Sequence, residues 1–511
     1  MNRSHQQHFQ INREWEILFA LLLTAFVVRC IFFSGGIRGS DAFAYAQYAY
    51  DIASGSYDLN SINGFYGFRY FVLLPTAFSF MIFGVNDLSS GIFPYIFSLL
   101  NIIVVFYLGK IIFNKEIGII ASGLLIIYPL DISASNCVSP DSFIPFFSSL
   151  AILCYILAEE NISSGYRKIL LLLLSGILIS FAYMSRVTSV FLFFAIAIYQ
   201  LFHKRYAAFL WTAVGLSIPL IAEAFYFYLY TGDPFFEIHR ITSLAIATAI
   251  KSDYDIGLLF YPKHMLGFEL SGLAMFGFTW WFVAGGLVTL WMKGVTKNTE
   301  LLIIVCLLIP FFGFEFGFQS LNEGILIGKN PNYMSLITGP AMIISGYFFY
   351  HMFFFIRTRF NTKSIAIFTI FTMMIISMNL YGTYRLFMNM RNDAAPYIAV
   401  ADHLIRKPGS TIYVHHFRWP LFLKYFLRYN SSYTFRDLNK LSEEDLINLS
   451  NVYIVFNRRY LEADVIGRPV LQQTVYAKYE KIPPKNWKKV LSYSGVPAYN
   501  SVVIYHVEKQ L

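Results

Sequence analysis

Residues 39–51 read GSDAFAYAQYAYD and follow the first long apolar run of the chain, WEILFALLLTAFVVRC at 15–30. Asp41 opens this stretch, and Tyr45, Tyr48 and Ile52 recur behind it at helical spacing. The spacing predicts a short amphipathic helix that lies at a membrane interface, with the carboxylate at its N-terminal end. An aspartate in that position accepts backbone N–H groups and suits the helix dipole, so capping is the first interpretation of Asp41.

The composition is that of an integral membrane protein. Of 511 residues, 57% are hydrophobic and 14% are charged, whereas about 25% of residues are charged in soluble globular proteins. The net charge of +9 comes from short basic clusters between apolar runs, which membrane topology explains better than nucleic-acid binding does. The four cysteines show no CxxC or Cys/His spacing, so neither a disulfide framework nor a zinc site is indicated.

Eleven apolar runs have about the length needed to cross roughly 30 Å of hydrocarbon. They lie near 15–34, 88–109, 116–131, 141–158, 169–185, 187–202, 206–230, 266–292, 300–320, 333–356 and 364–386. A twelfth run, YFVLLPTAFSFMIFG from Tyr70, is barely long enough and contains Pro75.

The basic residues decide whether the run at Tyr70 crosses the membrane. If it stays on the outer surface, the basic clusters after the first run all fall in inner loops, as the Lys/Arg bias of cytoplasmic loops requires. We therefore predict eleven transmembrane helices, with the N-terminus inside, the C-terminus outside, and interfacial helices in the first outer loop. The same topology places Asp131, Asp141, the segment 231–265 and the whole tail on the outer face.

The tail changes character near Asn392. Three stretches, STIYVHHF, NVYIVFNRR and YNSVVIYHV, look like short strands, and they alternate with helical stretches such as LSEEDLINLS. In the last of these, Ser442 and Asp445 have capping-box spacing. We predict a transmembrane domain over 1–391 and a small extracytoplasmic α/β domain over 392–511.

Four ionisable residues share the outer boundary of the membrane in this topology: Asp41, Asp141, Arg69 and Arg186. Each aspartate alone is explained as a helix cap. Ionisable groups at such depth are costly, however, and tend to mark sites. Two arginines would grip a phosphate, and a carboxylate would activate a hydroxyl or hold a divalent cation, so the set suits a phosphate-bearing lipid substrate.

The same residues resemble a known family. RGSDAFAYAQYAYDIASGSYD, GFRYFVLLPTAFSFMIFGVND and ASNCVSPDSF, in this order within about residues 15–200, look like the N-terminal half of the GT-C membrane glycosyltransferases. The similarity is greatest to relatives of the dolichyl-phosphate-mannose protein mannosyltransferases and the lipid A aminoarabinose transferases. YLYTGDPFF at 228–236 also looks like a turn of that family.

The resemblance implies an inverting glycosyltransferase, with hexose or pentose as the sugar. It moves the sugar from a polyprenyl-phosphate-linked donor to a lipid, glycan or protein acceptor on the outer face. Asp41 corresponds to the essential aspartate that acts as base, and Asp141 to the acidic residue of the next outer loop. The remaining implied roles are donor-phosphate binding by Arg69, Arg186, Lys251 and Lys263, and sugar or acceptor contacts by Tyr45, Tyr66 and Tyr70.

A divalent cation (Mg, Mn or Zn) is the one cofactor to consider, with Asp41 and Asp141 as its ligands. Many relatives carry a second acid directly after the first aspartate, and some carry a glutamate before the basic residue of the loop. This chain has Ala42 at the first position and Gly67 and Phe68 at the second. The departures put the metal site in doubt more than the sugar transfer.

Two other function classes remain open. A transporter or channel would show paired discontinuous helices and charges at the midplane, whereas the notable acids here lie at the outer edge. A non-catalytic membrane scaffold could use the same fold and would tolerate substitution of Asp41. For an enzyme of this kind, the plasma (inner) membrane of a bacterium or archaeon is the expected location. Glu223, Glu269 and Glu315 lie in or near spans and receive no role from the sequence.

Overall fold

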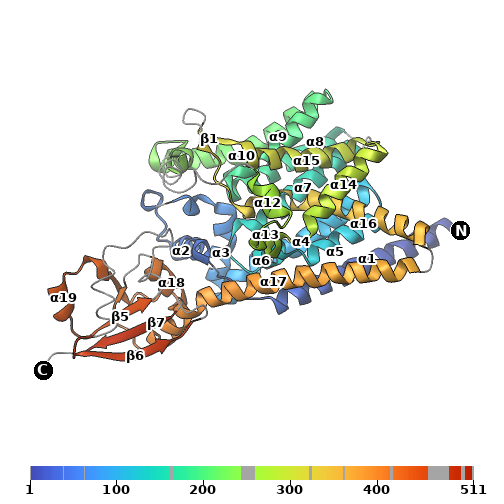
Figure 1. Ribbon diagram of the computed structural model, residues 1–511. Coiled ribbons are helices and arrows are strands. Elements are labelled where there is room, and N and C mark those ends of the chain that lie inside the picture. Colours follow the sequence, from blue (N-terminus) through green and yellow to red (C-terminus); the bar gives the residue numbers. More distant parts are fainter. Residues whose placement is uncertain are drawn as a thin grey trace.

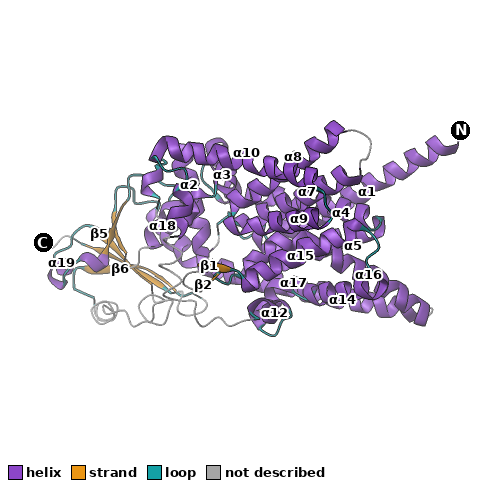
Figure 2. Ribbon diagram, turned by 90° about the horizontal axis from the view of Figure 1, so that it is seen from above, coloured by secondary structure: helices purple, strands orange, loops and turns teal. Residues whose placement is uncertain are grey.

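The computed structural model describes residues 2–37, 39–62, 64–160, 165–242, 259–320, 325–360, 363–414, 418–457, 483–495 and 501–508. Helices build one long bundle, and a small sheet stands at one end of it (Figures 1 and 2). The first residues of the chain lie at the opposite end of the bundle from the sheet (Figure 1).

Each of the eleven apolar runs forms a helix or a pair of helices. They are α1 (Asn2–Ile31), α4 (Asp87–Ile112), α5 (Lys115–Ile126), α7 (Pro140–Glu160), α8 (Gly165–Ser185), α9 (Val190–Phe202), α10 (Tyr206–Thr231), α13 (Leu270–Phe276) with α14 (Thr279–Lys293), α15 (Asn298–Phe316), α16 (Thr338–Phe360) and α17 (Lys363–Leu404). Among the described residues, seven helices are long and apolar enough to cross a membrane, or eight if α13 and α14, which are bent by 73°, form one span. The chain is therefore a multi-pass membrane protein, as predicted.

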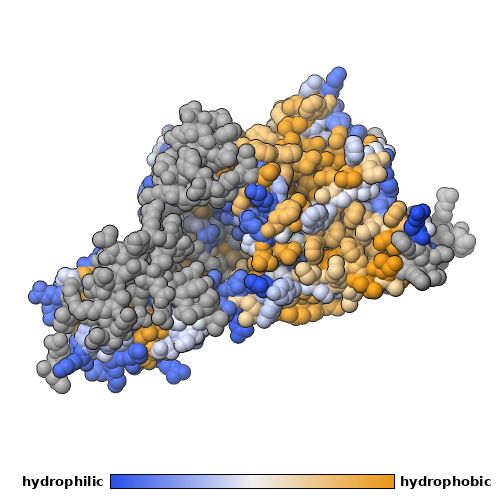
Figure 3. All heavy atoms as spheres, in the orientation of Figure 1, coloured by the Kyte–Doolittle hydropathy of each residue, from blue (hydrophilic) through white to orange (hydrophobic). Residues whose placement is uncertain are grey.

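Apolar side chains cover much of the bundle on the face that Figure 3 shows. Phe19, Met81 and Ile221 each expose more than half of their surface, which suits contact with lipid and not with water. Inside the bundle the helices approach closely where residues are small. A Cβ on Gly176 of α8 would lie 2.1 Å from the Thr212 carbonyl oxygen of α10, and one on Gly215 would lie 2.2 Å from the Leu173 carbonyl oxygen. Small residues let these helix backbones meet, a common device of membrane bundles.

Short elements gather at the end of the bundle that carries the sheet. The first outer loop forms α2 (Gly39–Ser54), the 3₁₀ turns η1 (Leu59–Ser61) and η2 (Phe65–Phe68), and α3 (Tyr70–Phe83). At about 1.5 Å per residue, α3 is roughly 21 Å long and falls short of the hydrocarbon thickness. It fits the predicted interfacial helix. Later segments add α6 (Pro129–Ala134), α12 (Phe260–Met265), η4 (Pro331–Ile337) and the hairpin of β1 (Phe318–Ser320) and β2 (Ile325–Leu326).

The tail forms a five-stranded sheet in the order β4-β3-β5-β7-β6. Its elements are β3 (Thr411–Val414), α18 (Arg418–Phe426), β4 (Thr434–Asp437), α19 (Glu443–Ile447), β5 (Val452–Asn457), β6 (Trp487–Tyr493) and β7 (Val502–Val507). β3 pairs in parallel with β4 and β5, while β7 runs antiparallel between β5 and β6. The three predicted strands are confirmed as β3, β5 and β7, and the Ser442–Asp445 capping box is present at the start of α19. α17 runs without interruption through residue 391 to Leu404, so the predicted domain boundary lies inside a helix, and the division itself stays a prediction.

Candidate functional site

Asp41 lies in the first turn of α2 and is exposed. Its Oδ1 accepts a hydrogen bond from the Tyr66 hydroxyl of η2 at 2.9 Å. The segment before α2 is fixed by backbone hydrogen bonds from Gly36 N to Asp87 O (3.1 Å) and from Val138 N to Gly36 O (3.0 Å). Because Val138 precedes Asp141 by three residues, these bonds tie the segments that carry both aspartates to each other.

Arg69 stands between η2 and α3, with aromatic rings around its guanidinium. The guanidinium carbon lies 4.7 Å from the ring centre of Phe65, 5.4 Å from that of Tyr45 and 6.0 Å from that of Tyr66, and Nη1 donates a hydrogen bond to the Tyr45 hydroxyl. Burial, together with the neighbouring Arg186, lowers the pKa of Arg69 to about 9. The guanidinium is still protonated at neutral pH, and it interacts electrostatically with Asp41 and Asp141.

Asp141 and Arg186 form a buried ion pair. Arg186 Nη2 lies 2.6 Å from Asp141 Oδ1, and both side chains are 8% exposed. Arg186 also donates to the Asn332 carbonyl oxygen at 3.2 Å and stacks its guanidinium 5.1 Å from the ring centre of Tyr333. Asp141 lies in the first turn of α7, which begins at Pro140, a residue that suits the first helical position because its missing N–H has no helical partner there.

The structure therefore gathers four predicted site residues, Asp41, Asp141, Arg69 and Arg186, at the sheet-bearing end of the bundle. Tyr45 and Tyr66 contact Arg69, as described above. Tyr70 faces elsewhere: its hydroxyl accepts from the Tyr57 hydroxyl at 3.2 Å, and its ring packs against that of Tyr226. Nothing in this geometry tests the predicted roles, which stay predictions.

The two predicted lysines do not join this group in the described structure. Lys263 is exposed on α12 and forms no side-chain hydrogen bond or ion pair with the described residues. Lys251 lies outside the described residues.

Lys329 is a cation that the sequence reasoning missed. Its ammonium lies 3.5 Å from Glu315 Oε1, and both side chains are almost fully buried. Glu315 in turn accepts the backbone N–H groups of Leu259 (2.8 Å) and Tyr261 (3.0 Å). This network anchors the start of the segment that offers the Asn332 carbonyl and the Tyr333 ring to Arg186. The only sequence feature that points to Lys329 is the polar stretch that contains it, GKNPNY, between two apolar runs.

A third buried ion pair joins α1 to α6. Arg29 Nη2 lies 2.5 Å from Asp131 Oδ2, with exposures of 0% and 1%, and Ser98 Oγ of α4 donates to the same oxygen at 2.6 Å. The expectation of Asp131 in an outer loop is wrong in one respect: the residue lies on a short helix inside the bundle. Its burial is tolerated because a guanidinium neutralises the carboxylate.

The aspartates do not form a ready metal site. Among the described residues no three His, Cys, Asp or Glu side chains come together. One oxygen of Asp141 already faces a guanidinium at 2.6 Å, and two arginines stand close by, so the local charge disfavours a divalent cation. The residues present therefore do not fit a metal.

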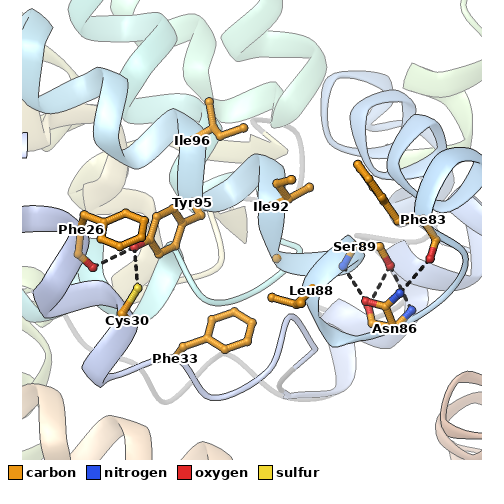
Figure 4. Close-up of a pocket in the computed structure, with 11 residues that line it drawn as sticks. Phe26, Cys30, Phe33, Phe83, Asn86, Leu88, Ser89, Ile92, Tyr95 and Ile96 are labelled. Atoms are coloured by element: carbon orange, nitrogen blue, oxygen red, sulfur yellow. Dashed lines mark hydrogen bonds between the residues drawn. The ribbon is translucent and has the colours of Figure 1, made fainter. Parts of the chain in front are cut away.

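An apolar cavity of about 660 Å³ lies between α1, α3 and α4 (Figure 4). Phe26, Phe83, Leu88 and Ile92 form much of its wall, and all four are exposed on the outside of the bundle. Polar groups at the edge of the cavity already form hydrogen bonds within the protein: the Tyr95 hydroxyl donates to the Phe26 carbonyl at 2.8 Å, and the Asn86 side chain caps α4. Such a cavity suits a hydrocarbon chain.

The comparisons with known proteins agree with this fold. Residues 71–227 match the family model described as dolichyl-phosphate-mannose-protein mannosyltransferase; this stretch includes Asp141 and Arg186 and begins just after Arg69. No curated protein matches the chain in sequence.

Among the solved structures that resemble the whole chain are three from two proteins. Two are ArnT from Cupriavidus metallidurans. The apo structure has a TM-score of 0.62 and 13% identity, and the match covers 98% of this chain and 100% of ArnT. The structure bound to undecaprenyl phosphate has a TM-score of 0.62 and 13% identity, and the match covers 96% of this chain and 99% of ArnT. The third is the Archaeoglobus fulgidus oligosaccharyltransferase in complex with Zn and sulfate. Its TM-score is 0.53 and its identity 13%, and the match covers 96% of this chain and 73% of the oligosaccharyltransferase. At this identity the structures show a shared fold. Together with the family model they confirm the resemblance to the GT-C glycosyltransferases that the sequence predicted.

Proposed function

We propose that this chain, which has the fold of the GT-C glycosyltransferases, is an inverting glycosyltransferase that uses a polyprenyl-phosphate-linked sugar. The observation that carries the proposal is the convergence of Asp41, Arg69, Asp141 and Arg186, from four separate segments, at one end of a membrane bundle. The undecaprenyl phosphate bound by ArnT and the family model over 71–227 support the same donor class. The acceptor is a hydroxyl group of a lipid, glycan or protein.

The site supplies the groups that this reaction needs. Arg69 and Arg186 bind the donor phosphate, and their charges stabilise the phosphate as it leaves. Asp41, which is exposed beside them, removes the proton of the acceptor hydroxyl while the acceptor oxygen forms its bond to the anomeric carbon. The bond from that carbon to the phosphate oxygen breaks, and its electron pair leaves with the lipid phosphate. A single displacement inverts the anomeric centre.

Asp141 acts through Arg186. The ion pair at 2.6 Å fixes the direction of the guanidinium, while the Asn332 carbonyl and the Tyr333 ring hold it from the other side. Asp141 is thus a positioning residue in this proposal, although the sequence suggested a catalytic one.

The apolar cavity between α1, α3 and α4 is the place we assign to the isoprenoid chain. Asn86 lines this cavity. The carbonyl of the next residue, Asp87, accepts a hydrogen bond from the backbone N–H of Gly36, which lies in the segment that leads to Asp41. A lipid that enters from the side of the bundle would therefore place its phosphate near the segments that carry the site. In this orientation the site faces outward and the tail is extracytoplasmic, in the plasma membrane of a bacterium or archaeon.

Transfer of a labelled sugar from short polyprenyl-phosphate donors by the purified protein tests the proposal. Hexosyl and pentosyl donors are compared, with lipid, glycan and peptide acceptors. We expect turnover with one donor and a product of inverted anomeric configuration. A product of retained configuration would contradict the single displacement.

Replacing Tyr66 by phenylalanine is expected to lower the turnover number moderately. The change removes the hydroxyl that donates to Asp41 at 2.9 Å and keeps the ring beside Arg69. A hydrogen bond to a charged group contributes about 1.5–3 kcal/mol, which corresponds to a loss of roughly 10- to 160-fold. The initial rate of transfer at saturating donor measures the effect, and unchanged turnover would show that Tyr66 does not orient Asp41.

Arg186→Lys is expected to raise the KM for the donor by roughly tenfold or more, with a smaller change in kcat, because lysine keeps the charge but loses the fork that binds Asp141 and phosphate together. Steady-state kinetics with varied donor concentration separates the two parameters. Lys168→Arg, at the other end of α8, is the control. If kcat fell while the KM stayed constant, phosphate binding by Arg186 would be the wrong role.

Removal of divalent cations is expected to leave turnover unchanged, because the carboxylates do not gather as metal ligands and Asp141 is already paired. The measurement is the transfer rate after dialysis against EDTA, with and without added Mg²⁺, Mn²⁺ or Zn²⁺. Loss of activity that returns with one of these ions would show that Asp41 and Asp141 rearrange to bind it.

A further inference from the structure

The helix that carries Asp41 contacts different parts of the protein with its two faces. Tyr45 follows Asp41 by four residues and therefore lies on the same face of α2, where it contacts Arg69. Phe43 follows Asp41 by two residues, which places it about 200° around the helix axis. Tyr50 comes seven residues after Phe43 and shares its face. α2 thus turns one face to the candidate site and the opposite face away from it.

That opposite face packs against α18 of the tail, which lies beside α2 in both views of the chain (Figures 1 and 2). The Phe43 side chain is 2% exposed. Its ring centre lies 4.2 Å from that of Phe422, 5.7 Å from that of Tyr425 and 5.5 Å from that of Phe426. Aromatic contacts have preferred geometries, so these three rings restrict rotation of α2 as well as burying its surface.

A stacked pair holds α2 near its C-terminal end. The rings of Tyr50 and Tyr429 lie 4.2 Å apart, with planes at 12°. Tyr429 follows α18 and has a φ of 52°, a left-handed conformation that a bulky residue adopts only where its surroundings compensate the cost. Its backbone N–H donates to the Lys424 carbonyl at 2.7 Å. The chain therefore leaves α18 in a strained turn that places the Tyr429 ring on α2.

The Tyr425 hydroxyl reaches the first turn of α4, which also holds the segment before α2. This hydroxyl donates to Asp87 Oδ1 at 3.2 Å and lies 2.8 Å from Ser90 Oγ. The backbone of Gly36 lies against the same turn, since a Cβ on Gly36 would lie 2.5 Å from the Ser90 Cβ and 2.6 Å from the Asp87 carbonyl oxygen. One turn of α4 therefore connects α18 to a residue five positions before Asp41.

The orientation of α2 depends on such contacts because the helix is short. Its 16 residues are close to the length at which an isolated helix is only marginally stable in water, so packing has to hold it. A misplacement of about 1 Å can lower catalysis by roughly 10²-fold, even when its cause lies far from the reacting atoms. Contacts on the far face of α2 can therefore control a carboxylate on the near face.

We propose that α18 is a positioning element of the candidate site, in which Phe422, Tyr425 and Tyr429 fix the orientation of α2 and thereby the position of Asp41. The catalytic consequence rests on the proposed function, whereas the hold of α18 on α2 does not. The three residues act through α2 and need no contact with donor or acceptor. The tail is therefore required for turnover with every acceptor that the protein uses.

Amide hydrogen exchange of the purified full chain, measured by mass spectrometry without substrate, tests the hold of α18 on α2. Tyr425→Phe removes the hydroxyl that reaches α4, and Tyr429→Leu removes one of the stacked rings. We expect residues 39–54 to exchange at least threefold faster in each variant than in the wild type. Exchange in β5 and β7 should stay unchanged, because the sheet of the tail keeps its pairing.

Tyr433→Phe is the matched control. It removes another tyrosine hydroxyl of the tail, one that donates to the Leu404 carbonyl of α17 at 2.8 Å. We expect exchange of residues 39–54 and the turnover number to match those of the wild type.

Kinetics of sugar transfer test the catalytic consequence. Tyr425→Phe and Tyr429→Leu should each lower kcat roughly tenfold or more, by the same factor with each acceptor that the wild type uses. The Kd for a short polyprenyl phosphate should change less than threefold, because Asp141 and not α2 holds Arg186.

Unchanged exchange of residues 39–54 in both variants would overturn the proposal. Faster exchange with an unchanged kcat would overturn it as well, because Asp41 would then not depend on α18. Faster exchange without turnover in any protein, the wild type included, would support the hold of α18 on α2 and refute glycosyl transfer. Gel filtration and thermal unfolding check that the variants are folded; if Tyr429→Leu is not, Tyr425→Phe decides, because it removes a single oxygen atom.

Discussion

Asp41→Asn is expected to lower the turnover of sugar transfer by about 10²- to 10⁴-fold, the range attributed to a general base. Asparagine keeps the size of the side chain and its ability to accept hydrogen bonds, including the one from Tyr66 at 2.9 Å, but it cannot take a proton at neutral pH. Because Asp41 is exposed in the first turn of α2, its loss should change the unfolding temperature little. The measurement is kcat at saturating donor, together with thermal unfolding in the same detergent.

Asp51→Asn is the matched control for this variant. Asp51 lies on the same helix and is held by Gln47 at 2.8 Å, but it stands near the far end of α2 and outside the proposed site. We expect its turnover to match that of the wild type. If Asp41→Asn also retained full turnover, Asp41 would be a helix cap and the assignment of the base would fail.

Asp131→Asn and Arg29→Met are each expected to destabilise the protein by about 3–5 kcal/mol, because either change leaves the other charge buried without a partner. The pair is 0% and 1% exposed, and its atoms are 2.5 Å apart. Its loss should also loosen the contact of α1 with α6, the two elements that lead to Asp41 and Asp141. Thermal or denaturant unfolding in detergent measures the change.

The double variant Arg29→Met/Asp131→Leu should recover much of the lost stability, because it buries no charge at all. Glu14→Gln provides the comparison: Glu14 pairs with Lys110 at 2.7 Å, but the side chains of Glu14 and Lys110 are 26% and 34% exposed, so a change of at most about 1 kcal/mol is expected. Single variants as stable as the wild type would mean that water or other groups solvate the charges, and the pair would not hold α1 to α6.

The helical bundle could be predicted because the sequence features that indicate it, apolar runs and basic clusters, are local. Each apolar run is long enough to form a helix, and the Lys/Arg bias of cytoplasmic loops predicts how the runs alternate across the membrane. The same charge argument predicts an interfacial position for α3. In the tail, β3, β5 and β7 are rich in β-branched and aromatic residues, whereas β4 (TFRD) and β6 (WKKVLSY) carry charges that hide a strand pattern. α18 was missed because its nine residues are too few for helical periodicity to stand out.

The site could be predicted only in part, since its contacts are long-range. Asp41 and Asp141 were predicted because they begin helices, and Arg69 and Arg186 because the predicted topology places them at the same boundary of the membrane. The ion-pair partners of the aspartates could not be predicted. Asp141 and Arg186 are 45 positions apart in the sequence, and Asp131 and Arg29 are 102 positions apart.

Release of free polyprenyl phosphate together with the glycosylated product is the decisive measurement for sugar transfer by this chain. Purified wild-type protein is incubated with a short polyprenyl-phosphate sugar and an acceptor, and lipid phosphate and glycosylated product are quantified together. We expect free lipid phosphate and glycosylated product to form in equal amounts, and the anomeric configuration of the product to be inverted. If no donor releases its lipid phosphate while the protein is folded and binds the lipid, the chain uses this fold for something other than sugar transfer.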